Sequence, residues 1–169
     1  MISTFYSLVI LSSPLSTDSL PDPVALYPLN GRHGTKDISR NENPQGIPSN
    51  TALAPGPNGH PYGSFQFSGT PTSYVHIPNN GGLDIKNSIT ILAWVNRESN
   101  EGLIFEYSCG TCFRLWFVND GRLYCNAKWH FHQSSPIPSN SWYHVGASYD
   151  SLSGTAKVWV NGQAAVEVK

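Results

Sequence analysis

Three cysteines are the residues of this chain whose spacing most directly suggests chemistry. Cys109, Cys112 and Cys125 lie within 17 residues, and three thiols allow at most one internal disulfide bond. A Cys-x-x-Cys pair also occurs in zinc and redox sites, but zinc needs a second pair or suitably spaced histidines, and the redox motif needs a β-α-β context. The sequence shows neither the additional zinc ligands nor the β-α-β context. We expect one structural disulfide; three free thiols or a metal or redox site are the less favoured alternatives.

Acidic and imidazole side chains give weaker signals. Hydrolysis of a glycosidic bond needs two carboxylates about 5 to 9 Å apart, but Glu98, Glu101 and Glu106 do not alternate along one face of a strand. His130 and His132 share a strand face and would suit a transition metal, although this spacing arises more often by coincidence. No Gly-x-Ser-x-Gly nucleophile motif is present. The sequence therefore predicts no catalytic residues and no enzyme activity.

Composition and charge narrow the class of protein. The chain has 169 residues and a formal net charge of −1, with 12% charged residues, so it offers no basic field for nucleic acid. Its 15 glycines and 13 prolines suit short strands joined by tight turns. An all-β domain is therefore favoured.

The N-terminal segment differs from the rest. An apolar run from Phe5 to Leu11 has the length of a signal-peptide core and is too short to cross a bilayer. No Lys or Arg precedes it, so residues 1–23 are interpreted either as a signal peptide or as a disordered leader. The domain is expected to begin at Val24, and no other stretch is apolar enough to span a membrane.

From Val24 onward the sequence alternates strand and turn signals. A segment rich in Gly, Pro, Asn and Ser, Arg32 to Pro61, is expected to form a long loop, and such loops are usually functional or folded around an ion. Strands are predicted, on their β-branched and aromatic content, at residues 24–31, 64–69, 73–78, 87–97, 101–107, 112–118, 122–129, 142–149, 155–160 and 163–169.

Two tight turns predict hairpins. Asn119-Asp120-Gly121 and Asn161-Gly162 each separate two strand patterns. Across the first turn, paired residue numbers are expected to sum to about 241, which places Cys125 opposite Trp116 rather than Cys112. A bond between Cys112 and Cys125 would then need a bulge or another register.

Several of these segments together resemble a known family. They are "VALYPLNG", "DISRN", "FQFSG", "YVHIPN", "LDIKNSITILAWV", "GLIFEY", "WYHVGASYD" and "KVWVNG". In this order they resemble the laminin G-like, concanavalin A-like jelly-roll family, in its pentraxin-related branch, over about residues 24–169. The most specific part is "SITILAWV" followed by "WYHVGASYD" and "KVWVNG".

The resemblance implies a fold of two curved antiparallel sheets packed as a jelly-roll sandwich. Members of the family continue past the hairpin at Asn161-Gly162 and return a last strand beside the first. The domain of residues 24–169 is therefore expected to be incomplete, with missing C-terminal strands supplied by a parent protein or left as an open seam beside residues 24–31. An uncovered edge there would invite pairing with other chains.

The resemblance also implies ligands. Laminin G-like domains often bind calcium at an edge of the sandwich, and oxygen ligands would come from Asp37 and Asn41, with Asn79 or Asn80 and Asp84 as weaker additions. Ordinary Asx-turn chemistry explains the same residues.

The family's usual role is binding glycans or extracellular proteins through a sheet face or the edge loops. Trp129, Trp142 and Trp159 have faces that suit sugar rings, although packing in the sandwich explains them as well. Basic candidates are Arg32, Lys36 and Arg40, too few for strong heparin binding.

We therefore predict a secreted or extracellular, non-enzymatic recognition or adhesion module that contacts a glycan or protein through its edge loops. The alternatives are a glycan-binding accessory domain of a larger hydrolase and a fragment without independent activity. This interpretation rests on fold analogy.

Overall fold

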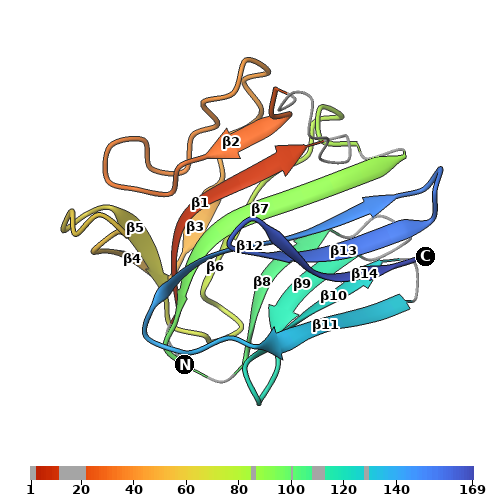
Figure 1. The fold of residues 1–169 in the computed structure, drawn as a ribbon. Coiled ribbons are helices and arrows are strands. Elements are labelled where there is room, and N and C mark those ends of the chain that lie inside the picture. Colours follow the sequence, from red (N-terminus) through yellow and green to blue (C-terminus); the bar gives the residue numbers. More distant parts are fainter. Residues whose placement is uncertain (1–2, 12–21, 85–86, 100, 108–112, 128–129) are drawn as a thin grey trace.

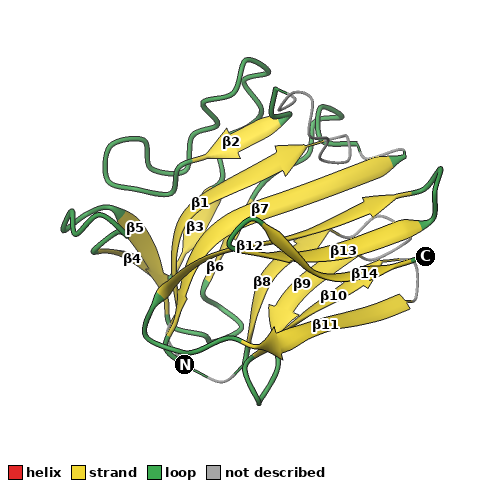
Figure 2. Cartoon of the chain, viewed as in Figure 1, coloured by secondary structure: helices red, strands yellow, loops and turns green. Residues whose placement is uncertain are grey.

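The computed structural model describes residues 3–11, 22–84, 87–99, 101–107, 113–127 and 130–169. These residues form strands and turns without a helix (Figure 2), as the composition and the resemblance predict. The strands are β1 Ser3–Leu11, β2 Ala25–Tyr27, β3 Ile47–Ser49, β4 Thr51–Ala54, β5 Ser64–Phe67, β6 Tyr74–His76, β7 Ser88–Arg97, β8 Gly102–Tyr107, β9 Phe113–Phe117, β10 Arg122–Ala127, β11 His130–Pro136, β12 Trp142–Asp150, β13 Thr155–Val160 and β14 Gln163–Val168.

The strands form three antiparallel sheets (Figure 1). The large sheet has eight strands in the order β14-β13-β12-β7-β1-β5-β4, with β2 also paired to β1. A four-stranded sheet has the order β11-β10-β9-β8, and a two-stranded sheet joins β3 to β6. β10 and β11 lie against β13 and β14, so the four-stranded sheet covers the inner face of the large sheet at that side.

The core lies between these layers. Alternate residues of the long central strands point inward because side chains alternate along a strand; Ile91, Val95 and Val145 are almost fully buried. Leu115 and Leu123 meet them from the four-stranded sheet and are likewise buried. This arrangement is the jelly-roll sandwich that the sequence predicts.

Residues 3–11 change the predicted start of the domain. We expected a leader before Val24, but β1 pairs with β7 along most of its length and with β2 and β5 on its other side. Ile10 and Leu11 are buried, and Leu8 packs against the core. An apolar run of this length fits a signal-peptide core and a central strand equally well, so pattern alone does not separate them. In this structure residues 3–11 form part of the large sheet, and the interpretation of residues 1–23 as a signal peptide or leader stays a prediction.

The uncovered edge expected along residues 24–31 is also absent in the described structure. One side of β2 pairs with β1, through Leu26 opposite Val9. The other side is used by the long loop: Leu26 N–H donates to Asp37 Oδ1, and Ile38 N–H donates to the Leu26 carbonyl. Both edges of this strand therefore have partners.

The predicted long loop contains two strands that the sequence did not reveal. β3 and β4 lie within Arg32 to Pro61 and pair with β6 and β5. Each is three or four residues long, too short to show an alternating pattern among the surrounding turn residues.

The hairpin at Asn119 to Gly121 forms as predicted, with a register shifted by one residue. Val118 N–H donates to the Arg122 carbonyl, and Gly121 has φ of 82°. This is a three-residue loop with glycine in the left-handed position, so paired residues differ from those of a two-residue loop. Cys125 consequently lies opposite Leu115 rather than Trp116.

Gly146 shows how tightly the central strands pack, and it gives a first prediction. A Cβ atom at this position would lie 2.5 Å from the Ile91 carbonyl oxygen and 2.6 Å from Leu92 Cδ2. Alanine in a strand usually gains stability over glycine, but this backbone contact outweighs that gain. We expect Gly146→Ala to lower the free energy of unfolding by about 2 kcal/mol, measured by urea denaturation; an unchanged or raised midpoint would contradict the packing.

Candidate ligand-binding groove

A groove of about 810 Å³ opens on the inner face of the large sheet. Its floor includes Leu8 and Ile10 of β1 and Ala93 of β7. These positions alternate with outward-facing residues, so the floor is apolar. Ile10 and Ala93 are themselves buried, and Leu8 is the most exposed of the three.

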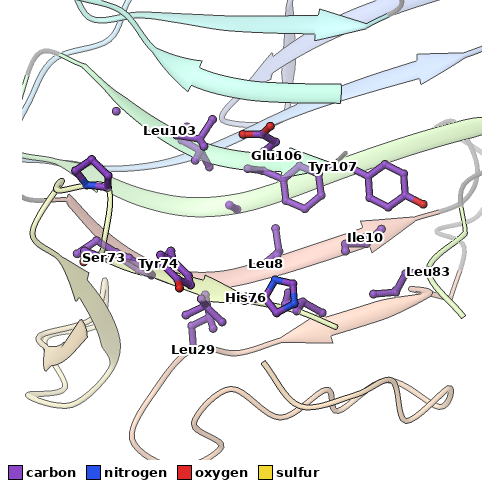
Figure 3. Close-up of a pocket in the computed structure, with 18 of the residues that line it drawn as sticks. Leu8, Ile10, Leu29, Ser73, Tyr74, His76, Leu83, Leu103, Glu106 and Tyr107 are labelled. Atoms are coloured by element: carbon purple, nitrogen blue, oxygen red, sulfur yellow. The ribbon is translucent and has the colours of Figure 1, made fainter. Parts of the chain in front are cut away.

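Two walls rise from this floor (Figure 3). Tyr74 and His76 of β6 lie on one side of Leu8, and Leu103 and Glu106 of β8 lie on the other. Every residue of β8 lines the groove. Its lining also includes residues 69–71, Ile77, Asn79, Leu83 and Asp84.

The groove has an apolar floor and polar groups at its rim. Leu103 and Tyr74 are large side chains left 54% and 49% exposed. Asp84 and Glu106 supply carboxylates, and no Lys or Arg occurs among the lining residues. Glu106 is held by Arg114, with 2.7 Å between Oε1 and Nη2. An apolar concavity with a few polar groups at its margin is the usual form of a ligand-binding site.

This groove was not predicted from the sequence. It is formed by segments that are distant in the chain, and only one local signal pointed toward it. The segment "GLIFEY" of β8 carries apolar residues at successive positions, which is unusual for an edge strand that faces water on one side.

Asp37, the first calcium candidate, organises the long loop. Its Oδ1 accepts hydrogen bonds from the N–H groups of Leu26 and Ser39, at 2.8 and 2.9 Å. Its Oδ2 accepts from Ser39 Oγ and from the N–H and Nδ2 of Asn43, at 2.7 to 2.9 Å. Burial alone would raise the pKa of Asp37, but these hydrogen bonds outweigh it and lower that pKa below its usual value.

The same network extends to the core. Tyr27 donates its hydroxyl to the Pro44 carbonyl at 3.0 Å. Burial, with the charge of Asp37 as a smaller cause, raises the pKa of Tyr27 to about 12. Asn43 Nδ2 also donates to the Val24 carbonyl at 2.7 Å, so the loop is tied to the start of β2 from several directions.

Calcium binding by the predicted ligands stays a prediction, and in the structure these side chains make hydrogen bonds within the protein. The Asp37 carboxylate already accepts five hydrogen bonds, and Asn41 uses its Nδ2 to bind the Val24 carbonyl. Asn79 Nδ2 donates to Asp84 Oδ1 at 2.7 Å, which is local turn chemistry. Asn80 accepts from Gly82 N–H in the same turn. In the described residues no three His, Cys, Asp or Glu side chains cluster as a metal would need.

Comparison with known proteins agrees with the architecture. The Laminin_G_3 family model, described as Concanavalin A-like lectin/glucanases superfamily, matches residues 68–168, which is more than half of the chain. The chain belongs to the Laminin_G_3 family. No curated protein and no solved structure matches it. The predicted laminin G-like resemblance is thereby confirmed, whereas its pentraxin-related branch stays a prediction.

Membership of the family indicates a binding module. Laminin G-like domains are generally non-enzymatic and bind carbohydrate or protein, although the superfamily also includes glycosidases. Among the residues described here, no helix is long and apolar enough to cross a membrane.

The basic candidates of this laminin G-like domain lie apart from the groove lining. Arg32, Lys36 and Arg40 are exposed, and Arg40 pairs with Asp22 at 3.1 Å, both side chains being largely in solvent. Such exposed pairs contribute little stability. Binding of an anionic glycan by these residues stays a prediction.

The tryptophan candidates lie on the outer face or outside the described residues. Trp159 donates its indole N–H to Ser148 Oγ at 3.0 Å, and Lys157 lies over its ring at 5.7 Å. Trp142 is half-buried and pairs across the sheet with Asn96. Trp129 is outside the described residues. The Trp159 ring is thus partly covered, which favours packing over sugar stacking at that position.

The remaining chemical candidates do not form a site in the described structure. Cys125 is a free thiol, 1% exposed, and burial raises its pKa to about 12; it is therefore not part of the expected disulfide. Cys109 and Cys112 are outside the described residues, so a bond between them stays a prediction. The backbone at His130 and His132 belongs to β11, opposite Ala127 and Cys125.

Proposed function

We propose that this laminin G-like domain is an extracellular, non-enzymatic recognition module that binds an apolar segment of a partner protein in the groove. The groove itself supports the proposal: a volume of about 810 Å³ with an apolar floor and exposed Tyr74 and Leu103 at its rim. The edge loops, including Arg32 to Pro61, would make secondary contacts.

The floor favours a polypeptide over a glycan. Sugar hydroxyls need hydrogen-bond partners, and desolvating them against Leu8, Ile10 and Ala93 would cost free energy. Aliphatic side chains of a peptide would instead gain about 25 cal/mol for each Å² of apolar surface buried. Polar groups at the rim, such as His76 and Asp84, can orient a peptide without entering the floor.

Glycan binding is the second candidate, and one observation favours it. On the outer face of the large sheet the rings of Trp94 and His144 lie in tilted contact with centroids 5.3 Å apart, and Trp142 lies on the same face two residues before His144. Burial lowers the pKa of His144, so this imidazole is neutral at pH 7. Together they present an aromatic surface of the kind that sugars stack on.

The test compares two ligand classes on the intact chain. A fluorescein-labelled peptide of valines and threonines flanked by lysines, and a panel of labelled oligosaccharides, are titrated in fluorescence anisotropy. The groove variant is Leu103→Lys, which changes an exposed side chain and should leave folding intact. The matched control is Leu152→Lys, since Leu152 is 92% exposed in the turn after β12 and is not part of the groove lining.

We expect the peptide to bind the wild type and to bind Leu103→Lys about tenfold more weakly, with Leu152→Lys unchanged. If only the oligosaccharides bind, and Trp142→Ala abolishes that binding, glycan binding at the outer face replaces the proposed function. Peptide binding that Leu103→Lys leaves intact would remove the groove from the proposal.

A further inference from the structure

Two sheet edges border the groove. β8 is the terminal strand of the four-stranded sheet, and β6 is the terminal strand of the two-stranded sheet. Both strands line the groove, on opposite sides of its apolar floor. A terminal strand directs backbone N–H and C=O groups sideways, toward whatever lies next to it. The groove therefore combines a hydrophobic floor with two backbone edges.

Two features that limit strand pairing occur at these edges, since β6 has only three residues and the pairing of β8 with β9 is irregular between Leu103 and Phe105. Lysine and proline, the other common features, do not occur in either strand. Lysine, proline and inward-pointing charges guard the edge strands of most proteins. β6 has the sequence Tyr-Val-His, and β8 contains Glu106 as its one charged residue and no proline. Glu106 is itself neutralised by Arg114 of β9. Apart from Glu106, neither strand carries a charged residue or a proline that would oppose the approach of another strand.

We propose that the groove binds by strand addition, taking up an extended segment of the partner protein between β6 and β8. This inference rests on the proposed function and specifies its ligand. The segment forms backbone hydrogen bonds with the β8 edge, and its alternate side chains enter the groove above Leu8, between the exposed side chains of Tyr74 and Leu103. Affinity then comes largely from the backbone and selectivity from the alternating side chains.

The dimensions and charge of the groove define the segment further. β8 has six residues, and strands rise about 3.3 Å per residue, so a segment of about six or seven residues would lie along it. Its inward positions are apolar and its outward positions polar. Asp84, with no Lys or Arg among the lining residues, favours a basic residue at one end of the segment.

The experiment uses peptides of one composition in different arrangements. The first is Lys-Val-Thr-Val-Thr-Val-Lys, which alternates apolar and polar residues. The second is Lys-Val-Val-Val-Thr-Thr-Lys, and the third is the alternating peptide methylated on the valine nitrogens, which removes the N–H groups along one edge. Each carries fluorescein and is titrated with the 169-residue chain, while amide hydrogen exchange of β8 is followed with and without peptide.

We expect the alternating peptide to bind about tenfold more tightly than the other two, a difference of about 1.4 kcal/mol, and to slow amide exchange in β8. Leu103→Lys should abolish this preference, and Leu152→Lys should retain it.

Equal affinity for the three peptides would overturn strand addition while leaving the apolar groove as the binding site. Failure of every peptide to bind would overturn the proposed function as well. Sedimentation measures the oligomeric state as a further check. If the wild type is a dimer and Leu103→Lys is a monomer, the groove binds a second copy of the chain, and the proposal of a segment from a partner protein is overturned.

Discussion

Asp37→Ala is expected to lower the free energy of unfolding by about 3 kcal/mol. The carboxylate accepts hydrogen bonds from three backbone N–H groups, those of Leu26, Ser39 and Asn43. Alanine leaves these donors without their acceptor, and each half-buried donor that is left unpaired has its own desolvation cost. Urea denaturation measures the change, which is a large fraction of the total stability of an ordinary domain.

The control for this substitution is Asp22→Ala. Asp22 forms an exposed ion pair with Arg40, and its loss should change the free energy of unfolding by less than about 1 kcal/mol. Adding millimolar calcium to the wild type tests the other role of Asp37. We expect no rise in Tm, because the carboxylate is already occupied by hydrogen bonds. A calcium-dependent rise that Asp37→Ala removes would restore the predicted metal site.

The pH dependence follows from the lowered pKa of Asp37. A carboxyl group whose folded pKa lies below its unfolded value of about 3.9 stabilises the fold fully above that value. The contribution is then lost as the pH falls through the folded pKa. The difference in stability between wild type and Asp37→Ala should therefore be constant near neutral pH and shrink below about pH 4.

The long loop shows what residue types can and cannot predict. Aspartate and asparagine in a segment rich in glycine and proline suit both calcium binding and Asx-type turns. Which of these two roles the residues adopt depends on where hydrogen-bond donors such as Leu26 N–H lie. Leu26 belongs to β2, and only the tertiary structure brings β2 to the loop. The sequence predicted Asp37 as a calcium ligand, and residue types alone did not show that its carboxylate accepts hydrogen bonds from backbone N–H groups.

The fold was predicted better where signals are local. Alternation over 87–97 and 142–149 and the turn at Asn161-Gly162 depend on neighbouring residues. The structure confirms strands there, at Ser88–Arg97 and Trp142–Asp150. The N-terminal run and the short strands β3 and β4 depend on distant partners, which pattern cannot supply. The groove belongs to this second group, because β6, β8 and β1 meet only in the folded chain.

Arg97 is a buried cation. The sequence predicted only that it ends a strand, and not that its side chain is buried. Its side chain is 6% exposed, its Nη1 donates to the Ser99 carbonyl, and its Nη2 donates to the Ile137 carbonyl. The guanidinium also lies over the Phe117 ring at 5.3 Å. It therefore joins β7 of the large sheet to β9 and to the segment before β12, and Gly121 leaves the space that the guanidinium occupies.

Arg97→Ala is accordingly expected to lower the free energy of unfolding by about 4 kcal/mol, through two lost charge-assisted hydrogen bonds and the packing against Phe117. Arg97→Lys should recover part of this loss, since a single ammonium retains the charge without the planar fork that reaches both carbonyls. Burial lowers the pKa of Arg97, but arginine stays protonated at neutral pH. Arg40→Ala, at an exposed ion pair, is the matched control and should change stability by less than about 1 kcal/mol. If urea denaturation gave Arg97→Ala and Arg40→Ala similar free energies of unfolding, the link between the sheets would not depend on this side chain.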